Sequence, residues 1–211
     1  MAIWQYQLTV IPKQSVLEKF GKIPNKLEVN EEAWEKYWEN VIDIENLPEP
    51  NFEDVNTINW WKNSKIKKSE LVENIDKLVK RAEWSKGYLE SISWKGNENL
   101  EEDNDCFIAF NKYSRVIEEF SFRVDLRKKR NIENFLTGIL EICEKKELIV
   151  YNNEGILFLP KLELIIGDLK NSRAVDFLTN PEKFVEKIAK KENRSKIEKT
   201  NFWNKLKQFW N

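Results

Sequence analysis

The sequence VIEEFSFRVDL at residues 116–126 decides the fold class. From Phe120 onward every second residue is apolar, and the residues between them are small or charged. A period of two is typical of a β-strand that has one face in the core and the other exposed. The charged positions of this strand, Arg123, Asp125 and Arg127, are then predicted to form a row of ionic groups on the exposed face.

Further strands are predicted on both sides of this one. The run CFIAF at 106–110 is apolar on both faces, as a central strand is. A turn over 152–155, ending in Gly155, joins the last two strands as a hairpin. The other strand candidates are residues 4–10, 88–94, 147–151 and 156–160.

Apolar residues at helical spacing separate these strands. After Asn30, a stripe of Trp34, Tyr37, Trp38 and Val41 follows the spacing of an amphipathic helix. Further helices are predicted from Ser69 to Ala82, after Asn131, over 162–178 and from Pro181. The sequence therefore predicts an α+β fold, with a mostly antiparallel sheet of five or six strands, helices packed on one face and a basic amphipathic C-terminal helix. Residues 1–190 form one domain, and 191–211 form a polar spacer and an aromatic tail.

The composition favours recognition over chemistry. The chain has 211 residues, nine of them Trp and none of them His. The absence of His removes the commonest general base and the commonest metal ligand, whereas Trp is enriched in binding hot spots. We therefore assign no catalytic residue, no metal site and no cofactor.

Charge is distributed unevenly along the chain. Residues 182–211 contain nine Lys or Arg against four Asp or Glu, a balance of +5, whereas the chain as a whole has a net charge of −1. An acidic body argues against a nucleic-acid partner, and the basic tail remains available for phosphates or anionic lipid. Cys106 and Cys143 lie in apolar surroundings and are predicted to be buried free thiols. The N-terminus resembles no signal peptide, and no run approaches the roughly 20 apolar residues of a membrane span, which predicts a cytoplasmic protein.

An acidic loop is the first candidate for partner binding. Its carboxylates are Glu98, Glu101, Glu102, Asp103 and Asp105, and it lies between two predicted strands. The residues either keep a solvated loop soluble or form a patch that steers a basic protein partner. A site for a divalent cation is the third and weakest interpretation.

Two further groups have alternative interpretations. Arg123, Asp125 and Arg127 either bind an anion through the guanidinium groups or form cross-strand ion pairs. Trp60 and Trp61, in a long loop over 43–66, either mark a contact surface or belong to the core.

The C-terminal tail carries an apolar stripe at helical spacing, with Lys205 and Lys207 among the residues between. Its members are Phe202, Trp203, Leu206, Phe209 and Trp210. Three roles are open: docking onto the domain itself, gripping the groove of a partner, or lying in a membrane interface.

Several short motifs carry a family resemblance over residues 1–190. They are Trp4 with Ile11-Pro12, Ser93-Trp94-Lys95-Gly96 followed by Asn104-Asp105, Arg123 to Arg127, and Ser172-Arg173-Ala174 through Phe177 to Asn180-Pro181. In these the chain resembles bacterial α+β proteins that act as immunity partners of toxins. The resemblance implies a cytosolic protein that blocks a toxin by covering its active site or an essential surface.

These observations favour a non-catalytic protein-binding protein, most simply an immunity-type inhibitor of a basic toxin domain. The alternative is a peripheral adaptor that its tail tethers to a membrane. A metal-dependent carboxylate enzyme is the third hypothesis.

Overall fold

The protein forms one six-stranded antiparallel sheet with the strand order β2-β3-β4-β1-β5-β6. The computed structural model describes residues 2–43, 47–85, 87, 90–114 and 116–183. The strands are β1 (Gln5–Pro12), β2 (Ser91–Lys95), β3 (Asp105–Phe110), β4 (Ile117–Asp125), β5 (Leu148–Tyr151) and β6 (Leu157–Phe158). The predicted α+β class and the antiparallel sheet are confirmed.

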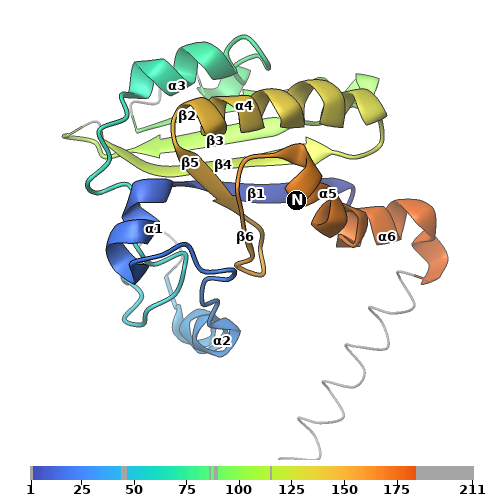
Figure 1. Cartoon of the computed structure of the whole chain (residues 1–211). Coiled ribbons are helices and arrows are strands. Elements are labelled where there is room, and N and C mark those ends of the chain that lie inside the picture. Colours follow the sequence, from blue (N-terminus) through green and yellow to red (C-terminus); the bar gives the residue numbers. More distant parts are fainter. Residues whose placement is uncertain (1, 44–46, 86, 88–89, 115, 184–211) are drawn as a thin grey trace, which may run out of the picture.

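The principal helices lie around this sheet (Figure 1). They are α1 (Lys13–Phe20), α2 (Glu31–Asn40), α3 (Lys68–Ile75), α4 (Thr137–Lys145), α5 (Leu162–Lys170) and α6 (Arg173–Thr179). In the view of Figure 1, α3 and α4 lie above the strands, α1 and α2 lie below them at one end, and α5 and α6 lie at the other end. Within the described ranges, no helix combines the length and apolar character that crossing a bilayer requires.

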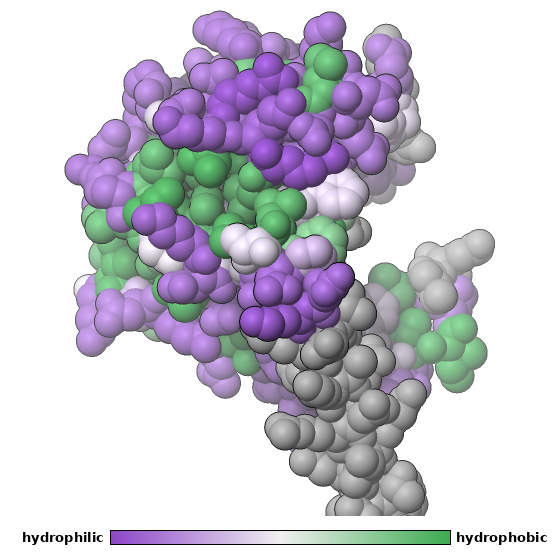
Figure 2. Space-filling view, turned by 90° about the vertical axis from the view of Figure 1, so that its right-hand side faces the viewer, coloured by the Kyte–Doolittle hydropathy of each residue, from purple (hydrophilic) through white to green (hydrophobic). Residues whose placement is uncertain are grey.

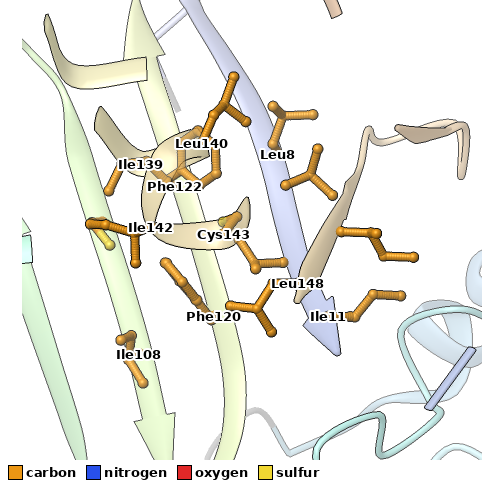
Figure 3. Close-up of a cluster of buried hydrophobic side chains, with 14 of the residues drawn as sticks. Leu8, Ile11, Ile108, Phe120, Phe122, Ile139, Leu140, Ile142, Cys143 and Leu148 are labelled. Carbon is orange, nitrogen blue, oxygen red and sulfur yellow. The ribbon is translucent and has the colours of Figure 1, made fainter. Parts of the chain in front are cut away.

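The core lies between the sheet and α4 (Figure 3). Strand register aligns Trp94, Cys106, Phe122 and Leu8 in one row across β2, β3, β4 and β1, and all four are at most 1% exposed. From α4, Ile139, Leu140 and Cys143 pack onto this face. Both cysteines are buried free thiols, as predicted, and burial raises the pKa of each thiol.

The opposite face of the sheet is mixed in polarity. Its central row consists of Ser93, Phe107, Ser121, Thr9 and Tyr151, which face one another across five strands. At the β5 end, Tyr151 is buried and its hydroxyl lies 3.3 Å from the side-chain oxygen of Asn56. Burial raises the pKa of Tyr151 to about 12.

Both edges of the sheet are closed by irregular segments of the same chain. Beside β2, the Ala82 N–H donates to the Ser93 carbonyl and the Lys95 N–H to the Lys80 carbonyl. Beside β6, the Leu157 N–H donates to the carbonyl of Asn25. These contacts satisfy backbone groups that would otherwise be available for pairing with another chain.

The local structure differs from the sequence-based expectation at α3. The helix begins at Lys68, with Lys67 and not Ser69 at the N-cap, and ends at Ile75 instead of continuing to Ala82. Asp76, at its C-cap, binds the Arg81 guanidinium and the Trp94 indole N–H. These bonds turn the following residues toward β2.

Two more differences concern α1 and Asn131. The helix α1, which no sequence pattern predicted, begins directly after Pro12. Asn131 does not cap its helix with its side chain, because that side chain is buried and donates to the carbonyls of Glu101 and Asp125. A π-helical turn over Asn131–Leu136 leads into α4. The continuation of the helix predicted from Pro181 beyond residue 183, and the whole of 191–211, lie outside the described residues.

Candidate partner-binding site

Four of the five carboxylates in the predicted acidic loop form ion pairs within the molecule, whereas Glu98 is exposed and has no ion pair among the described residues. Glu101 forms an ion pair with Lys128 at 2.9 Å, and Glu102 with Arg130 at 2.7 Å. Asp103 and Asp105 are 3% and 9% exposed, so they are not the solvated side chains that the sequence predicted. Lys95 forms an ion pair with both. Lys and Arg side chains of the molecule itself therefore neutralise most of the carboxylates that were expected to steer a basic partner.

The row of charges on β4 belongs to the same network. Register places Lys95, Asp105 and Arg123 side by side on three neighbouring strands, and the Arg123 Nε donates to Asp105 at 2.8 Å. This arrangement is the cross-strand pairing that we considered as one of two alternatives. Alternating charges on adjacent strands stabilise the sheet and leave few free donors for an anion.

Asp125 lies at the end of this row and is fully buried. Its carboxylate accepts from the side chain and backbone of Arg127 and from the Asp103 N–H at 2.9 Å. Burial by itself would raise the pKa of Asp125, but these hydrogen bonds outweigh it and hold the pKa below its usual value. The Arg127 guanidinium also lies 4.4 Å from the ring of Trp4. We conclude that Asp125 and Arg127 stabilise the fold.

The backbone at Gly96 packs closely against the backbone of the acidic loop. A Cβ at Gly96 would lie 1.9 Å from the carbonyl oxygen of Glu102, so no larger residue fits without a backbone shift. Among the described residues, no three His, Cys, Asp or Glu side chains are grouped as they would be around a metal ion.

Trp60 and Trp61 are core residues, which corrects their assignment to a contact surface. They are 5% and 1% exposed. The Trp60 indole donates to the carbonyl of Val55 at 2.8 Å, and the ring of Trp61 lies 6.5 Å from that of Phe120. The sequence left open whether this pair forms a contact surface or belongs to the core, and the structure shows that it belongs to the core.

The exposed aromatic surface lies on α2 instead. No residue of this helix is buried, although its sequence predicts an amphipathic helix with one buried face. Trp38 is 53% exposed, Ile42 is 99% exposed and Leu47 is 47% exposed. In Figure 1, α2 lies at the lower end of the molecule, away from the sheet. We call residues 31–43 and 47–52, which are α2 and the described residues that follow it, the α2 surface.

The aromatic rings of the α2 surface pack against one another. The ring of Trp34 lies 5.4 Å from Tyr37 and 5.0 Å from Phe52, both edge to face, and 6.3 Å from Trp38. The hydroxyl of Tyr37 donates to the carbonyl of Pro48 at 2.6 Å. These contacts order the rings before any partner arrives, which lowers the entropy lost on binding.

Asp54 connects the two ends of the α2 surface through hydrogen bonds. Its carboxylate accepts from the backbone N–H of Asn30 at 2.6 Å and from that of Asn56 at 2.8 Å. Asn30 in turn caps α2 by accepting from the Ala33 N–H, as the sequence predicted. Burial would raise the pKa of Asp54, but the hydrogen bonds from Asn30 and Asn56 hold it below its usual value. The two ends of the α2 surface are therefore joined at one buried carboxylate.

The α2 surface is strongly acidic. Its residues, 31–43 and 47–52, contain six Asp or Glu and one Lys. Glu32 forms an ion pair with Lys36 at 2.6 Å. The other three glutamates of α2, Glu31, Glu35 and Glu39, are exposed and have no ion-pair partner in the part of the chain that the structure describes. Sequence reasoning missed this surface, and the excess of acids around the aromatic stripe is the signal that could have identified it.

A second apolar area lies on the side of the molecule that carries α5 and α6. Figure 2 shows apolar residues gathered below a band of hydrophilic ones on this side. Exposed Leu164 on α5 and Leu178 on α6 lie here, 47% and 38% exposed, and the neighbouring Lys170 and Arg173 are also exposed.

Comparisons with known proteins identify no relative. No protein-family model matches the chain, and no curated protein and no solved structure is significantly similar to it.

Proposed function

We propose that the chain is a non-catalytic protein-binding protein that recognises a basic protein through the α2 surface. The observation that carries the proposal is the ordered cluster of exposed Trp38 with half-buried Trp34 and Tyr37, on a helix with unpaired carboxylates. Trp and Tyr supply large contact areas at a low entropic cost and dominate interface hot spots. Exposed carboxylates around them favour a cationic partner and accelerate association.

An immunity-type inhibitor is the specific role that we propose. An inhibitor of this kind works by covering a surface of a cytoplasmic toxin domain, and needs no reactive group of its own. Toxin domains that act on nucleic acid are basic, and the α2 surface has the opposite charge. The resemblance of the body to immunity partners points in the same direction.

The test is affinity capture from native cytosol with paired variants. Trp38→Ala with Ile42→Ala removes the exposed apolar side chains of the α2 surface. Trp84→Ala with Tyr113→Ala removes side chains that are 63% and 88% exposed elsewhere, and is the matched control. We expect one basic protein to be retained in equal amounts by the wild type and the control, and to be lost with the α2 variant.

Two results would refute the proposal. One is a stoichiometric partner that the α2 variant retains as well as the control does. The other is a retained partner that is acidic, because the carboxylates of α2 would then oppose binding. If the partner is a toxin, coexpression of this chain should also protect cells from it, and the α2 variant should fail to protect them.

A membrane adaptor is the second candidate. The apolar stripe of the tail together with the +5 balance of residues 182–211 favours it. The full chain should then sediment with anionic liposomes, and a chain ending at Lys199 should not. Equal sedimentation of the two chains would exclude the tail as an anchor.

A further inference from the structure

A cavity of about 680 Å³ lies between α3 and the sheet, away from the α2 surface. The segment from Ser64 to Ser69 and the first turns of α3 form one wall, and residues of β2 and β4 form the other. Cavities that bind small molecules commonly measure about 300–1,000 Å³, so this one can hold a ligand of that class.

One side of the cavity is apolar. Val72, Ile92 and Ile117 line it, and all three belong to the hydrophobic core and are less than 9% exposed. An apolar group placed against these side chains would lose its hydration without displacing any polar partner.

The charged part of the lining is mainly cationic. Lys65, Lys67, Lys68 and Arg81 contribute to it, against the single carboxylate of Glu73. Arg81 is held by a bidentate ion pair with Asp76 at 2.8 and 2.6 Å. The Lys68 ammonium lies 4.0 Å from the centre of the Phe110 ring, which fixes its position in the wall.

Two of these lysines form no ion pair with a described residue, although Lys67 lies near enough to Glu70 to contribute to the lowered pKa of that carboxyl. Lys65 and Lys67 are exposed, and within the described ranges neither has a carboxylate at ion-pair distance. Like charges around a concave site raise the local concentration of anions. An ammonium group without a partner is suited to phosphate, which it binds as a point charge.

We propose that this cavity binds an organic phosphate with an apolar body. The phosphate lies at Lys65 and Lys67, at the rim, and the apolar body lies against Val72, Ile92 and Ile117. The proposal is independent of the α2 surface, since no residue of that surface lines the cavity.

The test uses octyl phosphate as the probe and octanol as its uncharged counterpart, both titrated into the full chain by calorimetry. We expect octyl phosphate to bind at one site, and octanol to bind at least about tenfold more weakly because the lysines contribute nothing to it. In amide spectra, the shifts caused by octyl phosphate should centre on residues 64–69, Ile92 and Ile117.

Paired charge reversals locate the site. Lys65→Glu with Lys67→Glu should weaken octyl phosphate by at least about tenfold. Lys62→Glu with Lys80→Glu makes the same change of charge at exposed lysines outside the lining, and should leave the affinity within about twofold. Equal weakening by both variants, equal affinity for octanol, or no binding to the wild type would each overturn the proposal.

Discussion

Two regions of this molecule combine acidic and aromatic residues, and they use them in opposite ways. Around Asp103, Asp105 and Asp125, every carboxylate is matched by Lys or Arg, and nearby Trp94 is buried. On α2, Glu35 and Glu39 are unmatched and Trp38 is exposed. The first region holds strands together, whereas the second presents charge and apolar area to the solvent. Composition by itself does not separate the two, because pairing and burial decide which carboxylates remain available.

The largest expected effect comes from replacing one buried Trp and one exposed Trp by Ala and comparing the stabilities of the two variants. Trp61→Ala should lower the free energy of unfolding by about 3–5 kcal/mol, because it opens a cavity in the core. Trp38→Ala should lower it by less than about 1 kcal/mol, since the Trp38 side chain is about half exposed. Denaturant titration measures both. Equal losses would show that α2 belongs to the cooperative core, which would break the comparison.

The next largest effect is expected at Asp125. Asp125→Ala should cost about 3 kcal/mol, because it leaves the Arg127 guanidinium and the Asp103 N–H without their acceptor in a buried site. Glu31→Ala, at an exposed carboxylate of α2, should change stability by less than about 0.5 kcal/mol and is the control. A loss below about 1 kcal/mol for Asp125→Ala would mean that the network contributes little to the fold.

Charge reversal should separate the two regions in binding. Once a partner is in hand, Glu35→Lys with Glu39→Lys should slow association by about tenfold at low salt, and less at high salt. Glu101→Lys with Glu102→Lys should leave the association rate within about twofold, because these groups are paired with Lys128 and Arg130. Stopped-flow mixing distinguishes the outcomes. The reverse order of effects would return the contact surface to the acidic loop.

The smallest effect concerns pH. The folded-state pKa values of Asp54 and Asp125 are lowered, so both stabilise the fold fully above the unfolded-state pKa of about 3.9. That stabilisation is lost as the pH falls through the folded-state values. Melting temperature should therefore fall as the pH drops below about 4, and less steeply in Asp125→Asn than in the wild type. Parallel curves for the two proteins would show that Asp125 does not titrate differently on folding.

Periodicity predicted the sheet well, because strands that alternate or are wholly apolar leave little choice of face. It failed at α3, where the side chain of Asp76 takes Arg81 and Trp94 as partners and ends the helix early. Such contacts join residues that are separated in the sequence, and local spacing does not contain them.

The candidate site was harder to predict for the same reason. The stripe of Trp34, Tyr37 and Trp38 has the spacing of a core-facing helix, and spacing does not reveal whether a core lies opposite. The acidic loop was predicted to be available because its cations, Lys128 and Arg130, lie more than twenty residues further along the chain.

Hydrogen–deuterium exchange on the complex with the captured partner tests the central claim most directly. We predict that binding slows exchange at residues 30–42 and 47–52 and leaves residues 97–105 unchanged, because four carboxylates of the second segment already have cationic partners within the molecule. Slowed exchange at 97–105 with no change on α2 would contradict the account and place the partner on the ionic network.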